Sequence, residues 1–232
     1  MLRWHMSEVD MPEHVRLLIA HMCLNISIGV YGTRDNESPL SLLCDDLSVN
    51  ILTLAIIQTK REYIRIFTAV RQDGRELRDA SIKWKSNYEV VLAAVQQNGY
   101  ALEYASPKLR GDREVVLAAV RQKGWVLEWV SEELLGDREI VLAAVQEDGY
   151  ALYYASEELR GDYNVVLAAV QNYGWALEYA SEELRGYREV VLAAVRQSGW
   201  ALYYASEELR GDREVVLAAM RVDGLTLKYA SR

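Results

Sequence analysis

The chain has 232 residues, a formal net charge of −8 at pH 7 and a hydrophobic content of 51%. This acidity argues against nucleic acid and against an anionic membrane surface as partners, because both are bound mainly through Lys and Arg. No apolar run approaches the ~18 residues that a membrane-spanning helix needs, so the sequence predicts no membrane span.

The N-terminal residues predict an intracellular protein. Glu8, Asp10 and Glu13 precede the first apolar run, and no basic stretch leads it, so we expect no cleaved signal peptide. Cys23 and Cys44 are interpreted as reduced thiols, although the sequence leaves open a disulfide between them. The expected location is the cytoplasm, which would be that of a host cell if the protein is viral.

Residues 1–61 do not show the repeat that fills the rest of the chain, and they predict a divergent helical cap. Asp10 is a candidate N-cap for a helix that starts at the next residue. Residues 25–38 are rich in Gly, Asn and Asp and predict a loop. Residues 39 to about 59 predict one or two further helices. A repeat array needs such a cap because its first unit would otherwise expose a core face.

From about residue 62 a motif of Val-Leu-Ala-Ala returns every 25 residues. It begins at Val91, Val116, Val141, Val166, Val191 and Val216. A degenerate copy precedes them at Ile66 to Val70. Self-similarity at a fixed period of this length is typical of solenoids. The sequence therefore predicts an all-α fold, an α-solenoid of two-helix, 25-residue repeats over residues 62–232, with about seven units and a truncated last one.

Residues 112–136 show why each unit predicts two helices. Asp112 is a candidate N-cap, and Glu114 in the first turn suits the helix dipole. Gly124 is expected to end the first helix in a left-handed conformation, and a second helix is expected to start at Trp125 and to lead into a capped turn. Isolated helices below ~12–15 residues are marginal in water, so stacking between units must hold them.

Comparison of the units within the chain separates core candidates from surface candidates. The Ala-Ala pair is kept in every complete unit and predicts a close helix contact that a larger side chain would overpack. An aromatic residue is kept in the second helix and predicts a spine in which each ring packs on the next unit. The spine positions are Tyr104, Trp129, Tyr154, Tyr179, Tyr204 and Tyr229.

Two sets of residues are candidates for interaction. The first set is aromatic where other units are mostly polar, which predicts a partner-binding surface; it consists of Tyr153, Tyr163, Tyr173 and Tyr203. The alternative is a solvated face whose sequence has drifted.

The second set lies in the last unit, where Val222 replaces a polar residue and Leu225 replaces a Trp or Tyr. Together with Tyr229 these residues predict an uncovered repeat face that self-associates, and hence a homo-oligomer.

Other motifs have a structural interpretation. Arg-Gly-Asp occurs at residues 110–112, 160–162 and 210–212, where the glycine ends one unit and the aspartate caps the next helix. His21 and Cys23 are a close metal-type pair, but their spacing fits no zinc pattern, so no metal is expected.

No phosphate-binding glycine loop and no nucleophile elbow is present in the sequence, and the array contains no histidine. We therefore expect no catalytic residue, no cofactor and no enzyme activity. The alternative is an enzyme whose site lies in the N-terminal segment, with a pocket around His14, His21 and Cys23.

The repeated unit, Asp-Arg-Glu-Val-Val-Leu-Ala-Ala-Val-x-x-x-Gly-Trp-Ala-Leu-x-Tyr-Ala-Ser-Glu-Glu-Leu-Arg-Gly, resembles a short α-helical repeat that is catalogued as a domain of unknown function. The resemblance covers roughly residues 62–232 and departs from the pattern at Tyr187, where the cap aspartate is expected. It implies a helical array and a setting in large DNA viruses, protists or intracellular bacteria, and it implies no activity. The leading hypothesis is a non-enzymatic scaffold that binds another protein, and the alternative is a self-assembling component of a larger, viral assembly.

Overall fold

The computed structural model describes residues 39–231, with side chains from residue 51 onward. Predictions that concern residues 1–38, including the helix after Asp10, the loop over residues 25–38 and the metal-type pair His21 and Cys23, lie outside the described residues. The chain divides into two compact units, Met1–Ile57 and Gln58–Arg232. The second unit contains the repeat array.

The first described element is a single long helix, α2 (Pro39–Gln72). The predicted helix end near residue 59 was wrong. No glycine or proline follows Pro39 until Gly74, so nothing in the sequence stops the helix earlier. Its last turns supply the first α-helix of the array, because Val70 is fully buried and Ile66 and Phe67 pack against the array core.

Each 25-residue unit contains an α-helix, a six-residue 3-10 helix and a short third helical segment. The α-helices are α4 (Tyr88–Gln97), α6 (Arg113–Val120), α7 (Arg138–Glu147), α9 (Tyr163–Asn172), α11 (Arg188–Gln197) and α13 (Arg213–Val222). The 3-10 helices are η2 (Gly74–Asp79), η3 (Gly99–Tyr104), η4 (Gly124–Trp129), η6 (Gly149–Tyr154), η7 (Gly174–Tyr179), η8 (Gly199–Tyr204) and η9 (Gly224–Tyr229). The third segments are α3 (Ile82–Lys85), α5 (Pro107–Arg110), η5 (Glu132–Gly136), α8 (Glu157–Arg160), α10 (Glu182–Arg185) and α12 (Glu207–Gly211).

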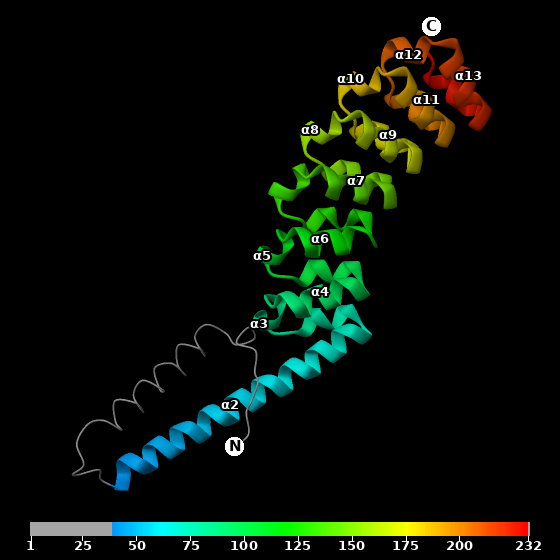
Figure 1. Cartoon of the computed structure of the whole chain (residues 1–232). Helices are drawn as coiled ribbons and strands as arrows, with labels where there is room; N and C mark the ends of the chain where they lie inside the picture. Colours follow the sequence, from blue (N-terminus) through cyan, green and yellow to red (C-terminus); the bar gives the residue numbers. More distant parts are fainter. Residues whose placement is uncertain (1–38, 232) are drawn as a thin grey trace. The chain divides into compact units, whose positions relative to one another are not determined.

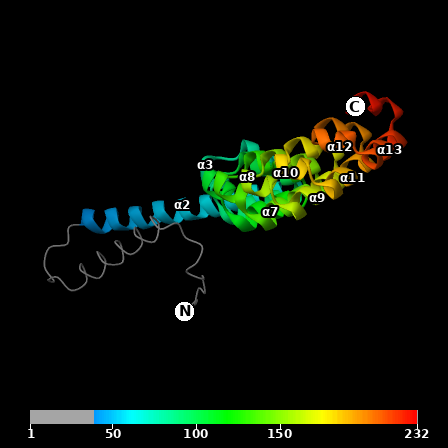
Figure 2. The same cartoon turned by 90° about the horizontal axis from the view of Figure 1, so that it is seen from above.

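The units stack in chain order. Figure 1 shows α7, α9, α11 and α13 side by side in one row, with α8, α10 and α12 in a second row, and Figure 2 shows the same two rows from above. The described residues contain no strand. The predicted α-solenoid of 25-residue repeats is therefore confirmed.

The predicted second helix of each unit is present, and it is a 3-10 helix because only six residues separate its extended N-cap from its extended C-cap and 3-10 geometry suits such short pieces. The prediction for the glycine at its start was wrong. This glycine, such as Gly124, does not end the preceding helix in a left-handed conformation. A Cβ at Gly174 would lie 2.6 Å from the carbonyl oxygen of Ala194 in the next unit. The glycine is thus required by the close approach of two backbones.

The core runs through the array as a repeating set of fully buried side chains. Leu102, Leu127, Leu152, Leu177 and Leu202 hold the same position in the 3-10 helix and are fully buried. The second alanine of the Ala-Ala pair is also fully buried, as in Ala94 through Ala219, whereas the first is half-buried. The predicted close helix contact is confirmed at that second alanine.

Backbone and side-chain hydrogen bonds connect each unit to the next. The backbone N–H of Ser181 donates to the carbonyl of Arg160 at 2.9 Å, and the same bond recurs at each junction from Ser106 to Ser231. A side-chain amide makes a second bridge: Gln122 Oε1 accepts from the N–H of Gly99 at 3.0 Å, and its Nε2 donates to the carbonyl of Gln96 at 2.7 Å. These bonds pair backbone groups that would otherwise be buried without a partner.

Candidate functional site

The 3-10 helices carry a row of aromatic rings that contact one another across four of the junctions between units. The second residue of one 3-10 helix packs edge-on against the sixth residue of the next, as in Tyr150 with Tyr179 at a centroid distance of 5.5 Å and Trp175 with Tyr204 at 5.9 Å. Burial, together with a hydrogen bond to Glu178, raises the pKa of Tyr204 to about 12. The predicted spine therefore exists, and its rings contact the preceding unit through a second aromatic position.

Tyr153 and Tyr203 pack against rings of this row and remain exposed to solvent. Both are the fifth residue of their 3-10 helix, where other units carry Glu, Lys or Arg, and they are 51% and 55% exposed. Tyr153 lies 5.0 Å from the Tyr154 ring and 5.2 Å from the Tyr179 ring. Each of these two tyrosines thus covers two spine rings and still presents half of its surface to solvent.

Tyr173 belongs to the same row. It is the N-cap residue of η7, makes no side-chain cap bond and is 38% exposed. It interacts electrostatically with the phenols of Tyr179 and Tyr204. We call Tyr153, Tyr173 and Tyr203 the tyrosine face, because all three lie in the 3-10 row of consecutive units.

The structure places Tyr163, the fourth predicted partner residue, elsewhere. It opens α9 and is half-buried; its ring packs edge-on against Tyr187 at 5.4 Å. A hydrogen bond to Glu189 in the next unit raises the pKa of Tyr163. Tyr163 therefore links two α-helices and is not brought together with the tyrosine face.

The position of Tyr163 is a bridging position in other units too. The hydroxyl of Tyr88 donates to Glu114 at 2.6 Å, and this bond raises the pKa of Tyr88 to about 12. Arg138 donates to Asp162 at 3.0 Å, and the guanidinium lowers the pKa of that carboxyl. A tyrosine or an arginine at the start of one helix thus contacts acidic residues at the start of the next.

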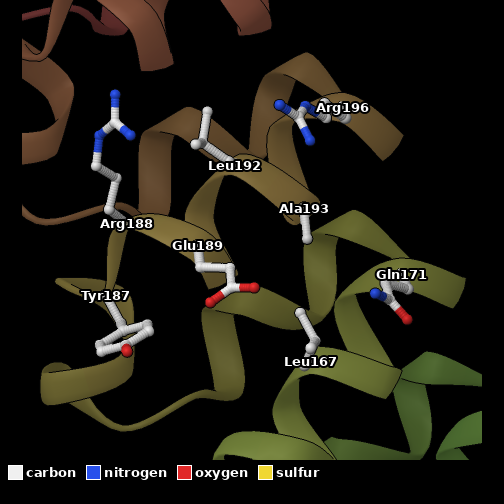
Figure 3. Close-up of a pocket in the computed structure, with 8 residues that line it drawn as sticks. All are labelled: Leu167, Gln171, Tyr187, Arg188, Glu189, Leu192, Ala193 and Arg196. Atoms are coloured by element: carbon white, nitrogen blue, oxygen red, sulfur yellow. The ribbon is translucent and has the colours of Figure 1, made fainter.

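A surface hollow of about 480 Å³ lies between α9 and α11, and sequence reasoning did not predict it. Figure 3 shows Leu167 and Gln171 on α9 and Leu192, Ala193 and Arg196 on α11. Tyr187, which precedes α11, lies at the opposite end from Arg196. The sequence did hold one signal, since Tyr187 departs from the repeat pattern.

Tyr187 makes the start of α11 unlike that of its neighbours. Asp112 and Asp137 each accept hydrogen bonds from two backbone N–H groups of the following helix, whereas Tyr187 makes no side-chain cap bond. Loss of an N-cap costs about 1 kcal/mol. The tyrosine instead presents an exposed ring to the hollow and packs on Tyr163.

The predicted self-association residues differ in exposure. Val222 and Leu225 are 49% and 70% exposed, but Tyr229 is half-buried against the rings of Trp200 and Tyr203. Leu217 and Leu227 are also exposed and were not predicted. Their equivalents in the preceding units are buried or half-buried, so the burial lost in the last unit could have been inferred from the repeat itself.

The Arg-Gly-Asp tripeptide takes part in the repeat junction. Asp112 accepts from the N–H groups of Glu114 and Val115, and Arg110 Nε donates to the carbonyl of Ala105 at 3.1 Å. In this first copy both charged side chains are engaged locally. In the other two copies Asp162 and Asp212 also cap their helices, but the Nε atoms of Arg160 and Arg210 are buried without a hydrogen-bond partner among the described residues, so the structural interpretation holds for the aspartate of every copy and for the arginine of the first.

The described residues hold no cluster of three or more His, Cys, Asp or Glu side chains able to hold a metal ion. None of the helices described for the chain is long and apolar enough to cross a membrane.

The fold and its repeating junctions define a helical-repeat protein of the solenoid class. Residues 66–110, 88–135, 112–160, 137–185 and 187–232 match the family described as a domain of unknown function, DUF4116. These matches cover more than half of the chain, which therefore belongs to this family. Comparisons with curated proteins and with solved structures gave no match.

Proposed function

We propose that the protein is a non-enzymatic scaffold whose repeat array binds another protein, of a host or of a virus, through the tyrosine face. The supporting observation is the exposure of Tyr153, Tyr173 and Tyr203 in three consecutive units, at positions that are mostly polar or charged elsewhere in the array. Tyrosine is enriched in protein interfaces and among the residues that dominate their binding energy.

The arrangement of these rings favours binding. Tyr153 and Tyr203 are held against spine rings, at 5.2 Å from Tyr179 and 5.1 Å from Tyr229. A side chain that is already held in place loses less conformational entropy on binding. Each ring offers an apolar surface with a hydroxyl at its edge, which suits contact with a partly polar protein surface.

The repeat itself supplies the variants that test this proposal. Tyr153→Glu and Tyr203→Glu introduce the residue found at Glu103, Glu128 and Glu178, and Tyr173→Asp introduces the cap residue found at Asp148. The triple variant should therefore fold. The matched control is Tyr163→Arg, because Arg113, Arg138 and Arg188 hold that position in other units.

The experiment is affinity capture by the full chain from a lysate of the cells that contain it, with quantitative mass spectrometry. A partner that is captured by the wild-type chain and by Tyr163→Arg, and lost with the triple variant, is the expected result. Partners retained equally by the triple variant would count against the tyrosine face as the binding surface.

A specific observation also favours self-assembly as a second function. Leu225 is 70% exposed and Leu227 is 53% exposed, and both belong to η9, at the positions of Trp200, which packs on Tyr229 of the next unit, and of Leu202, which is fully buried. Burial of such a face against a second copy removes apolar surface from water. The mass in solution, measured over a range of concentrations for wild type and for Leu225→Glu, tests this: a dimer or larger species that the substitution dissociates is expected, and a monomer at every concentration contradicts it.

A further inference from the structure

We propose that the hollow between α9 and α11 binds an extended, acidic segment of a partner protein, with an apolar side chain against Leu167 and Leu192 and a carboxylate at Arg196. The inference rests on the proposed protein-binding function, and it assigns a second surface that is separate from the tyrosine face. It also specifies the chemistry of the segment that is bound.

The floor of the hollow is apolar. Leu167 is half-buried on α9, and Leu192, which is buried, and Ala193 line the same space from α11. The Tyr187 ring forms one end of the hollow and is half exposed. A volume of about 480 Å³ has room for one or two side chains of a bound segment. Burial of an aliphatic side chain there contributes in proportion to the apolar area covered.

The charges around the hollow select an acidic segment. Arg188 forms ion pairs with Asp212 and Glu214 of the next unit, and Glu189 accepts a hydrogen bond from Tyr163. Arg196 has no ion pair within the described part of the chain. The cation that remains for a ligand is thus Arg196, and a guanidinium binds a carboxylate through two parallel hydrogen bonds.

The equivalent hollow between α6 and α7 shows what sets this one apart. There Arg121 forms an ion pair with Glu139 at 3.9 Å, and the hollow has a volume of about 290 Å³. Gln171 holds the position of Arg121 in the α9–α11 hollow, so no such ion pair spans it. One unit further on, Arg221 follows Arg196 in the same row and is exposed. An acidic segment that continues along the row would meet a second cation.

Tyr187 supports a binding role for the hollow. It replaces a cap aspartate that the neighbouring units keep, and the helix start loses its side-chain cap bond. Positions that break a local stability rule are expected at functional sites. At this position Tyr187 places an exposed aromatic ring at the end of the hollow.

The test uses random peptides displayed on phage, selected against the full chain and then counted against the Arg196→Gln variant. Gln occupies this position in other units, at Gln96, Gln146 and Gln171, so the variant should keep the fold. Arg121→Gln is the matched control, because it makes the same change in the hollow whose arginine is already paired.

Selected peptides should place Asp or Glu next to Leu, Ile or Phe. Their dissociation constants, measured with labelled synthetic peptides, should rise about tenfold in Arg196→Gln, as expected for one charge-assisted hydrogen-bonded pair, and stay unchanged in Arg121→Gln. Exchange of the acidic residue for Lys in the peptide should abolish binding, because Arg196 and Arg221 would then face like charges.

Three results would overturn the inference. The first is selected peptides without an acidic residue, and the second is equal affinity for wild type and Arg196→Gln. The third is binding that depends on Tyr153 and Tyr203 alone, which would leave the proposed function standing and remove the hollow as a site. A selection that yields no peptide at all also counts against the hollow and leaves capture through the tyrosine face to be judged by its own experiment.

Discussion

Residues 187–211 and 212–231 are neighbouring units with similar sequences and a different degree of burial. Leu202 is fully buried, whereas Leu227, at the same position one unit later, is 53% exposed. A Cβ at Gly199 would lie 2.6 Å from the carbonyl oxygen of Ala219, but a Cβ at Gly224 would meet nothing within 4 Å. The difference shows that a unit does not form its own core. The unit that follows completes it.

This comparison indicates how stability is distributed. In a repeat array each unit contacts its neighbours alone, so the free energy of unfolding is approximately a sum over units and junctions. The cost of a substitution should then depend on whether another unit covers the site. Identical residues at equivalent positions provide matched pairs of variants with which to test this.

The largest expected effect is at the core leucine. Leu177→Ala should lower the free energy of unfolding by about 3 kcal/mol, because it leaves a cavity in a fully buried site. Leu227→Ala should cost less than about 1 kcal/mol, as at other exposed positions. Urea unfolding at low protein concentration, followed by circular dichroism, measures both. Equal losses would mean that the face of Leu227 is covered in solution, which would favour self-assembly.

The glycine at the start of the 3-10 helix gives the next effect. Gly174→Ala should destabilise by about 2 kcal/mol, because the added methyl group would approach the Ala194 carbonyl oxygen to 2.6 Å and overpack the junction. Gly224→Ala has open space and should change the stability by less than about 0.5 kcal/mol. The difference between the two melting temperatures is the measurement. A small loss at Gly174 would show that adjacent units can move apart without cost.

Much of the fold could be predicted because the signals are local and repeat. Asp112, Asp137 and Asp212 are N-caps as predicted, since a short carboxylate reaches the free N–H groups of its own helix. The buried alanines were predicted from their small size and their constancy among units. These properties depend on residue type and spacing, which the sequence displays directly.

The rest depends on contacts between units, which the sequence does not display. Gly124 was predicted to end a helix, whereas a glycine is required there by the backbone of Ala144, 20 residues later in the chain. Tyr163 and Tyr173 looked equivalent as aromatic departures, yet one bridges two α-helices and the other lies in the 3-10 row. The hollow at Arg196 is distinguished by an ion pair that its arginine does not form with any described residue. The sequence does not display which charges are paired, because pairing depends on where the side chains lie in space.

A third prediction concerns the amide bridge, which the last junction lacks. Gln122 and Gln197 each accept a hydrogen bond from the N–H of the preceding unit's glycine, whereas Val222 offers no acceptor to Gly199. Val222→Gln should therefore stabilise by about 1 kcal/mol, and Gln122→Val should destabilise by at least that much because it leaves a buried N–H unpaired. Thermal unfolding of the two variants measures the pair. Opposite signs are expected, and a loss in both variants would contradict the bridge as a general feature of the junctions.

The smallest expected effect is the pH dependence of one ion pair. The hydrogen bond from Arg138 lowers the pKa of Asp162 below its ordinary value of 3.8, so this pair stabilises the fold above that value and loses its contribution as the pH falls through the lower folded pKa. Exposed ion pairs contribute about 0.2–1 kcal/mol, so the acid-dependent part of the melting temperature should be small. Asp162→Asn keeps an N-cap side chain but cannot ionise; below pH 4 its melting temperature should fall less steeply than that of the wild type. Arg213 holds the position of Arg138 in the last described unit and forms no ion pair within the described residues, so Arg213→Gln should leave the acid profile unchanged. An altered profile in that control would mean that an acidic group from another molecule pairs with Arg213, as it would if the outer face of the last unit were covered by a second copy of the chain.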